Sequence, residues 1–205
     1  MRGIALDYGG VLADDVTPGD AARAAAALGV RPEHLVAAVY GPERSLWNQA
    51  KIGDLTEREH WEQAGHALDL PAARMPELRR LFDEPRLHPA WLAFLREVRS
   101  RCGPSLRLAL VSNAIPCFTA IWRRLGLFEL FDIVINSSEV RYAKPDPLIF
   151  HLTLARLGVD GAHCAFVDDK RANVRAAEAA GMHGVLCRGD GEAIAEVEAW
   201  LGRGT

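Results

Sequence analysis

Hydrophobic and polar positions follow two different patterns along the 205 residues of this chain. Ile4 to Leu6 is a short apolar run, typical of a buried strand. From residue 19 to 88 the sequence reads as helical almost throughout, with no convincing strand. From residue 89 onward, short apolar runs alternate with helical segments of about ten residues. The chain is therefore predicted to contain a helical stretch between two parts of an alternating α/β unit.

Start and stop signals place the helices of the middle stretch. Thr56 to Glu59 has capping-box spacing, which predicts a helix start there. His60 lies on that polar helix, and its side chain is expected to be exposed to solvent. The aromatic residues Tyr40, Trp47 and Trp61 are expected to pack in the interior rather than to contact a substrate. We expect helices over residues 21–28, 32–41, 56–68 and 76–83.

The second half of the chain predicts a parallel sheet. Strands alternating with helices favour right-handed βαβ units, in which neighbouring strands run parallel. The fold class is therefore α/β: a three-layer, Rossmann-like parallel sheet core with a small all-helical cap. We expect residues 1–13 and 89–205 to form the core and residues 14–88 to form the cap. The later strands are expected at 106–111, 133–135, 164–167 and 184–187, and the later helices at 89–101, 118–125, 147–157, 171–180 and 192–201.

Composition excludes several classes of function. The formal net charge is −3 and the sequence contains no basic block, which argues against nucleic acid as a partner. The longest apolar run is well short of the roughly 20 residues of a membrane span, and the N-terminus lacks the layout of a signal peptide. The four cysteines are scattered and the histidines show no zinc-binding spacing. These features favour a cytoplasmic protein without a zinc site, and they leave the oligomeric state open.

The residues that follow each predicted strand are the candidates for chemistry. In open parallel sheets, ligands bind beyond the carboxyl ends of the strands. Three carboxylates at one such edge would repel each other unless a cation neutralised them. Oxygen ligands select magnesium over zinc, and a lysine, a hydroxyl and glycine amides suit a phosphate group. The hypothesis is a metal-assisted, covalent phosphoryl transfer at residues Asp7, Gly9, Gly10, Ser112, Asn113, Lys144, Asp168, Asp169 and Asn173.

Four segments in this order resemble a known family. The sequence is similar to the haloacid dehalogenase-like hydrolase superfamily, in the subfamily with a helical cap between the first and second motifs. The resemblance covers essentially the whole core and rests on residues 7–12 (DYGGVL), 111–113 (VSN), 143–147 (AKPDP) and 166–169 (FVDD). It implies a magnesium-dependent hydrolase, a phosphatase by preference, that acts on a small phosphorylated metabolite.

The resemblance also implies a role for each matching residue. Asp7 would be the nucleophile that becomes an aspartyl-phosphate, and Ser112 and Lys144 would hold the transferred phosphoryl group. Gly10 and Asn113 would assist in binding the substrate. The Mg²⁺ ligands would be Asp7, the main-chain carbonyl of Gly9 and Asp169, with Asp168 in an outer shell or bound through water and Asn173 bound through water.

Gly9 departs from the family pattern. The family usually has a second aspartate at this position, which acts as general acid and then as general base. Glycine still supplies the main-chain carbonyl for the metal, but it lacks the proton-transfer group. General acid–base catalysis is typically worth about 10²- to 10⁴-fold, so its loss would slow such an enzyme without abolishing turnover. Asp14, Asp15 or a cap residue is a candidate replacement.

Two other functions stay open. A metal-independent 2-haloacid dehalogenase would use the same nucleophile, and a departing halide needs no general acid. The acids at 168 and 169 argue for a cation and against this reading. A binding or regulatory protein with weakened catalysis is the other alternative, because a fold alone does not establish an activity. The identity of the substrate is not encoded in any recognisable motif of the cap.

Overall fold

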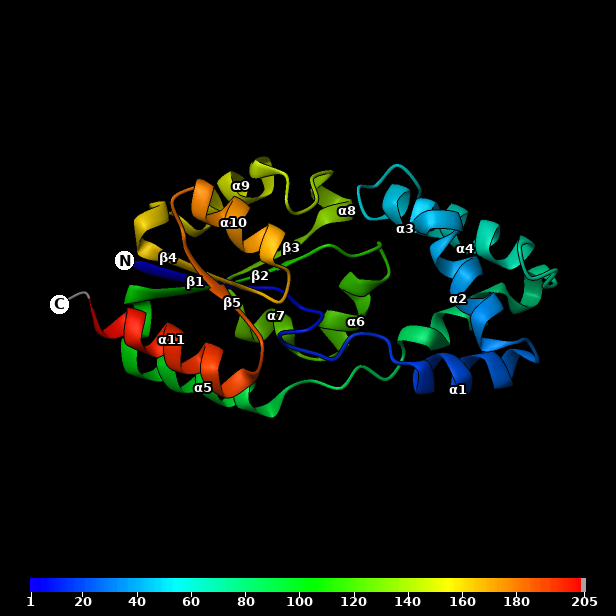
Figure 1. The fold of residues 1–205 in the computed structure, drawn as a ribbon, viewed down its shortest axis with the longest axis horizontal. Helices are drawn as coiled ribbons and strands as arrows, with labels where there is room; N and C mark the ends of the chain where they lie inside the picture. The colour runs from blue at the N-terminus through cyan, green and yellow to red at the C-terminus, as the bar shows by residue number, and fades with distance from the viewer. Residues whose placement is uncertain (204–205) are drawn as a thin grey trace.

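The computed structural model describes residues 1–203, and the core of this structure is a five-stranded parallel sheet. The strand order is β3-β2-β1-β4-β5, so the first strand lies at the centre (Figure 1). The fold is α/β and Rossmann-like, as the alternation of strands and helices predicted. The strands are β1 (Arg2–Leu6), β2 (Leu106–Ser112), β3 (Ile133–Asn136), β4 (Cys164–Asp168) and β5 (His183–Leu186).

Helices cover both faces of the sheet and make the three layers (Figure 1). On one face lie α9 (Pro147–Leu157) and α10 (Arg171–Ala179); on the other lie α5 (Pro89–Cys102) and α11 (Asp190–Gly202). Within residues 1–203, no helix combines the length and the hydrophobicity that a bilayer span requires. The shorter elements of the core are α6 (Phe118–Arg124), α7 (Leu127–Leu130), α8 (Ser137–Val140), and the 3₁₀ helices η3 (Gly103–Ser105) and η4 (Gly161–His163).

Alternation along the central strands explains why both faces are covered. In β2, Leu108 and Leu110 belong to the apolar cluster shared with α5 and α11, whereas Ala109 and Val111 belong to the cluster shared with α9. Successive side chains of a strand point to opposite faces, so a strand that is apolar at every position must be buried on both sides.

A separate group of helices, which we call the helical insert (residues 14–88), stands beyond the carboxyl ends of the strands (Figure 1). It has an apolar cluster of its own, with few residues from the core. The 45–50 helix was not predicted, and the last predicted helix is of the 3₁₀ type. The elements are α1 (Pro18–Leu28), α2 (Pro32–Tyr40), η1 (Pro42–Arg44), α3 (Ser45–Ala50), α4 (Glu57–His66) and η2 (Ala72–Phe82).

One expectation about the insert was wrong. His60 is fully buried rather than solvated, because its ring packs against Trp61 with the ring centroids 4.8 Å apart. Burial lowers the pKa of His60 to about 4, so the ring is neutral at physiological pH. The capping box itself is present as predicted, since Thr56 and Glu59 cap the start of α4 reciprocally.

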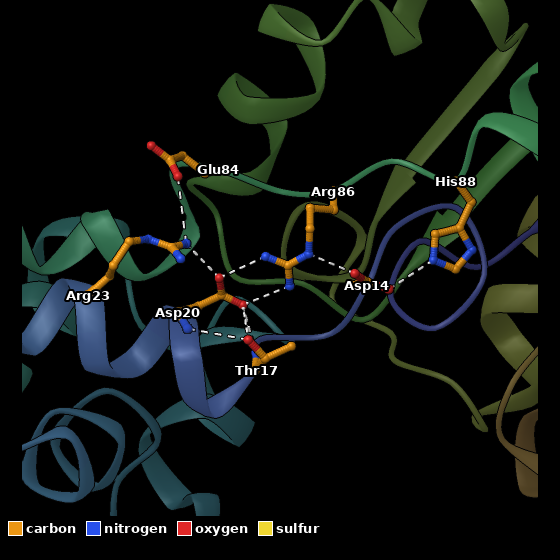
Figure 2. Close-up of polar contacts among 7 residues, drawn as sticks. All are labelled: Asp14, Thr17, Asp20, Arg23, Glu84, Arg86 and His88. Atoms are coloured by element: carbon orange, nitrogen blue, oxygen red, sulfur yellow. Dashed lines mark hydrogen bonds and ion pairs between the residues drawn. The ribbon is translucent and has the colours of Figure 1, made fainter.

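Two chain segments connect the insert to the core and lie antiparallel to each other, with a bridge between Ala13 and Leu87. Arg86 binds Asp14 at 2.8 Å and grips both carboxylate oxygens of Asp20, at 2.9 and 3.0 Å. Figure 2 shows the whole group, which we call the linker cluster: Asp14, Thr17, Asp20, Arg23, Glu84, Arg86 and His88.

Candidate active site

The central strand ends just before Asp7, at the point where the order in which strands are added to the sheet changes direction. The chain proceeds from β1 outward through β2 and β3, and then returns to β4 on the other side of β1. The main-chain N–H of Asp7 donates to the carbonyl of Val167, 2.9 Å away, so β1 and β4 end side by side. Such a switch point leaves a crevice in which open α/β sheets bind their ligands. The Asp7 side chain is buried there.

A single lysine lies between two carboxylates in this crevice. The Nζ atom of Lys144 is 2.8 Å from Oδ1 of Asp7 and 2.8 Å from Oδ2 of Asp168. It also donates to the carbonyl of Val111, at 2.8 Å. The Lys144 side chain is fully buried, so its three donors are aimed at fixed acceptors rather than at solvent.

One positive charge cannot satisfy both carboxylates equally. Burial raises the pKa of Asp7 to about 7, because the attraction of Lys144 is weaker than desolvation and the charge of Asp168 adds to the rise. Burial acts on Asp168 as well, but there the charge and hydrogen bond of Lys144 prevail and its pKa falls. Asp168 is therefore the ionised partner of the lysine, and Asp7 is poised between its two protonation states.

The two acids after β4 differ in how they are held. Both oxygens of Asp168 are occupied, by Lys144, by the Lys170 N–H and by the amide of Asn173 at 2.9 and 3.0 Å. Oδ1 of Asp169 is buried without a hydrogen bond, and Nζ of Lys170 is 3.5 Å from it. Burial raises the pKa of Asp169, with a further rise from Asp168.

These acids fit a divalent cation. One carboxylate oxygen from each of Asp7, Asp168 and Asp169 lies within 4.8 Å of the others. A buried carboxylate oxygen without a partner is costly unless a cation or a donor faces it. Oxygen donors of this kind select Mg²⁺, which keeps several waters and takes only a few protein ligands.

The residues of the second strand end lie on the other side of Asp7. Ser112 is almost fully buried and lines the cavity. Asn113 forms a reciprocal pair with the main chain of Lys144: its amide donates to the Lys144 carbonyl and its oxygen accepts from the Lys144 N–H, both at 2.7 Å. The structure thus gives Asn113 a part in positioning Lys144, and its predicted contact with substrate stays a prediction.

A main-chain hydrogen bond closes the turn after Asp7. The N–H of Gly10 donates to the carbonyl of Ala13, at 2.8 Å, so this amide is committed within the turn. Gly10 has a φ of 73°, and a Cβ there would lie 2.8 Å from Cγ of Asp169. A glycine is required at position 10, both by this close approach and by the backbone conformation. The predicted use of Gly10 in binding substrate stays a prediction.

Asp15, one of the candidates that the sequence left open for the missing acid, lies beside Gly9. A Cβ built on Gly9 would lie 2.5 Å from Oδ1 of Asp15. The carboxylate of Asp15 thus occupies the space that a side chain at position 9 would enter, and both residues line the same cavity. Asp14, the neighbouring candidate, is bound by Arg86 and His88 instead.

A cavity of about 630 Å³ joins the strand ends to the insert. Tyr40 and Trp47 line it, although the sequence favoured interior packing for both; Trp61 is in the interior as expected. Lys51 from the insert and Lys170 from the core also line it. Sequence reasoning missed these two lysines. Lys170 had a signal, its position directly after the paired acids, but nothing in the sequence distinguishes Lys51.

Comparisons with known proteins identify the family of this chain. A model of the haloacid dehalogenase-like hydrolase family matches residues 1–181. A phosphoglycolate phosphatase of Yersinia pseudotuberculosis is 31% identical over 88% of this chain and 78% of its own length. A family enzyme from Bacteroides thetaiotaomicron, solved in complex with magnesium and inorganic phosphate, superposes with a TM-score of 0.74 at 18% identity, covering 92% of this chain and 94% of its own.

A third match is the L-2-haloacid dehalogenase of Xanthobacter autotrophicus, with a TM-score of 0.67 and 23% identity over 96% of this chain and 81% of that chain. At this identity the match shows the shared fold alone. The central strand ends in a buried carboxylate, and a lysine and two further acids lie beside it. This arrangement defines the class of the protein as a hydrolase with an aspartate at the centre of its active site. The chain belongs to the haloacid dehalogenase-like hydrolase family.

Proposed function

We propose that this hydrolase is a magnesium-dependent phosphatase that acts on a small phosphorylated metabolite through an aspartyl-phosphate on Asp7. The observation that carries the proposal is the cluster of three carboxylates within 4.8 Å of one another, two of which share the buried Lys144. Cleavage of a carbon–halogen bond would need no cation, whereas a third acid beside Asp7 and Asp168 favours one. The phosphatase among the relatives and the magnesium and phosphate complex of the structural neighbour support the same activity.

We propose different tasks for the two oxygens of Asp7, on the support of their contacts. Oδ1 accepts the main-chain N–H of Tyr8 at 2.6 Å and faces Lys144 at 2.8 Å. Oδ2 is therefore the attacking atom. It forms a bond to phosphorus as the ester P–O bond breaks, and the alcohol departs with a proton. Water then attacks the phosphorus of the aspartyl-phosphate, which releases inorganic phosphate and regenerates Asp7.

Asp7, the carbonyl of Gly9 and Asp169 are the proposed protein ligands of Mg²⁺, with Asp168 and Asn173 in the outer shell. Asp168 suits the outer shell because protein donors already occupy both of its oxygens. When bound, the ion would offset the charge of the transferred phosphoryl group and hold Asp7 in its ionised form. Ser112 and Lys144 are the proposed contacts to that group, and Lys144 also keeps Oδ1 of Asp7 in place.

Asp15 is the proposed replacement for the acid that Gly9 lacks. Its carboxylate lies where a side chain at position 9 would project, at the cavity wall near Asp169. It would donate a proton to the leaving alcohol and accept one from the attacking water. An acid introduced at position 9 would meet the carboxylate of Asp15, which already fills that space.

The helical insert is proposed to act as a cap over the site, with the core formed by residues 1–13 and 89–205, of which 204 and 205 lie outside the described residues. A closed cap excludes water during transfer, which favours the ester over solvent. We place the protein in the cytoplasm, on the support of four cysteines that are all free thiols. The proposed partner is the phosphorylated small molecule alone.

The decisive experiment is a panel of phosphorylated metabolites assayed for phosphate release, with and without a chelator, alongside 2-chloropropionate assayed for chloride release. We expect phosphate release that requires Mg²⁺ and no chloride release. Chloride release that persists in the chelator, with no phosphate release, would establish the dehalogenase alternative. Magnesium binding without turnover of any ester would establish a non-catalytic protein.

A further inference from the structure

The insert side of the cavity carries positive charges that no carboxylate balances. Lys51 and Arg44 both line the cavity, and within residues 1–203 neither forms an ion pair. The other cations of the wall are paired: Arg86 with acids of the linker cluster, Lys144 with Asp7, and Lys170 with Asp169 at 3.5 Å. Lys51 and Arg44 are therefore available to a ligand.

The main chain fixes Lys51 against the core. The hydroxyl of Ser137 donates to the Lys51 carbonyl at 2.6 Å and accepts from the N–H of Ala114 at 3.1 Å. Ala114 follows the Ser112 strand end by two residues. Next to Lys51, Gly53 has a φ of 72°, and a Cβ there would lie 2.3 Å from a main-chain oxygen of α8. Arg141 donates to the Gly53 carbonyl at 2.9 Å. These contacts hold the lysine over the site independently of its own side chain.

Arg44 has a backbone conformation that is unfavourable for a residue with a side chain. Glu43 and Arg44 have φ values of 51° and 59°, in the left-handed region that residues with a side chain rarely occupy. The Arg44 guanidinium lies 4.9 Å from the centre of the Tyr40 ring, and Tyr40 also lines the cavity. Strained backbone of this kind clusters at ligand sites, because the surrounding structure holds a side chain where function needs it.

Lys51 shares the cavity with two like charges, Arg44 of the insert and Lys170 of the core. Nζ of Lys170 is 3.5 Å from Oδ1 of Asp169, so Lys170 lies next to the strand-end acids. Burial lowers the pKa of Lys51, and the charges of Arg44 and Lys170 lower it further. An anion between Lys51 and Arg44 would remove their mutual repulsion.

The phosphoryl group does not account for all of these charges. A divalent cation and Lys144 offset the three carboxylates of the strand ends. Lys170, Lys51 and Arg44 add three positive charges to the cavity, and a phosphate dianion offsets two of them. Lys51 and Arg44 both belong to the insert, so they are placed to meet another anion on the part of the substrate that the insert covers.

We propose that Lys51 and Arg44 bind a second anionic group of the substrate. The preferred substrates are then phosphate monoesters that also carry a carboxylate or a second phosphate. This inference rests on the proposed phosphatase activity and adds the substrate class to it. Charge-assisted hydrogen bonds from lysine and arginine are among the stronger polar contacts, and each is lost when the anion is replaced by a hydroxyl.

The test compares substrates that differ only in the second anion. Phosphoglycerate and glycerol phosphate differ by a carboxylate in place of a hydroxymethyl group, and fructose bisphosphate and fructose monophosphate differ by one phosphate. We expect the doubly anionic member of at least one pair to be favoured in kcat/KM by about tenfold or more, mainly through KM. The pair with the larger preference identifies the anion as carboxylate or phosphate.

The variants Lys51→Met and Arg44→Gln should each reduce this preference by about tenfold, and Lys51→Arg should retain most of it. Arg58→Gln is the matched control: Arg58 is an exposed cation of the insert, pairs with Glu62 at 2.8 Å and does not line the cavity. It should leave the preference unchanged. The conservative Lys51→Arg variant also separates the loss of a charge from a failure to fold.

The outcomes distinguish this inference from the function on which it rests. A wild-type enzyme that hydrolyses both members of each pair equally would overturn the second-anion site and leave the phosphatase intact. Equal losses on both members in Lys51→Met would do the same, because the lysine would then serve the phosphoryl group. Hydrolysis of no ester at all would instead overturn the proposed function.

Discussion

The protein contains two groups of clustered charges, and they are balanced in opposite ways. In the linker cluster, arginines and a histidine contact every carboxylate (Figure 2). The hydrogen bonds of Arg86 hold the pKa of both Asp14 and Asp20 below the usual range. At the strand ends, Lys144 is shared between Asp7 and Asp168, and Lys170 is 3.5 Å from Asp169. The pKa values of Asp7 and Asp169 nevertheless rise.

The difference teaches how to separate a structural charge cluster from a functional one. A group whose partners are all protein residues gains stability from being ionised and needs nothing further. When a carboxylate has too few partners, its ionisation destabilises the folded protein. Such a residue is maintained only because a ligand supplies the missing partner. By this criterion the linker cluster fixes the insert to the core, and the strand-end cluster awaits a cation and a substrate.

Asp14 and Asp15 show how finely the chain divides these roles. The two carboxylates are adjacent in sequence, yet Asp14 is bound by Arg86 and His88 while Asp15 reaches the space in front of Gly9. Adjacent side chains of an extended segment point to opposite sides, which is why one belongs to each cluster.

The largest effect should come from Asp7→Asn. Because the amide is a poor nucleophile, we expect phosphatase kcat to fall by about 10⁴-fold or more. The pKa of Asp7 is raised to about 7 in the folded protein, so in the absence of metal its ionisation weakens folding progressively as pH rises from about 4 to about 7. The metal-free variant should therefore be at least as stable as wild type at pH 8, as measured by thermal unfolding. A variant with normal turnover would disprove the nucleophile.

Asp169→Ala should remove the response to Mg²⁺. A ligand that binds only the folded state raises the free energy of unfolding, by about 2.7 kcal/mol when its concentration is 100 times Kd. We expect Mg²⁺ to raise the Tm of wild type by several degrees and to leave the Tm of the variant almost unchanged. Calorimetric titration provides a direct check, and equal affinities in the two proteins would contradict the assigned ligand.

Asp15→Ala should reduce kcat by about 10²- to 10⁴-fold if Asp15 is the general acid. The same substitution empties the space in front of Gly9. Gly9→Asp made in the Asp15→Ala background should therefore regain part of the lost turnover, whereas Gly9→Asp alone should not improve on wild type. Asp14→Asn is the matched control and should affect stability more than kcat. Unchanged kcat in Asp15→Ala would assign the proton transfer elsewhere.

Arg86→Met should lower stability without acting on the chemical step. The nearly buried carboxylate of Asp20 would keep its hydrogen bonds from Arg23 and Thr17 but lose the two hydrogen bonds from Arg86. We expect Tm to fall by a few degrees while kcat on a saturating substrate changes little. Arg58→Met, which removes an exposed ion pair, should shift Tm by less. A large fall in kcat with unchanged Tm would place Arg86 in the catalytic machinery.

The smallest effect should be the pH dependence of His88. Burial opposes its charge, but hydrogen bonds to Asp14 and Asp190, at 3.1 and 2.9 Å, prevail and raise its pKa above the ordinary 6.5. The stability from protonated His88 is thus complete below about pH 6.5 and is lost as pH rises through the raised pKa. His88→Gln should therefore destabilise the protein more at pH 6 than at pH 9, in denaturant titrations. An equal loss at both pH values would mean that the ring acts only by packing.

The sequence by itself determined the architecture and most of the candidate site. Strand β2 is apolar at successive positions, which requires a sheet covered on both faces, and the alternation with helices requires parallel strands. Once that is known, the residues after each strand must meet at one edge. Asp7, Ser112, Lys144, Asp168 and Asp169 follow from this rule together with the family resemblance.

Only the tertiary structure decided how those residues share their partners. Which carboxylate keeps the lysine, which oxygen of Asp169 lacks a hydrogen bond, and whether the Gly10 amide is free depend on how segments far apart in the sequence come together. The place of Lys51 depends on a contact between the insert and α8, and the place of Asp15 on how the linkers turn. A periodic pattern encodes which face of an element is buried, but it does not encode what the opposite wall of a cavity presents.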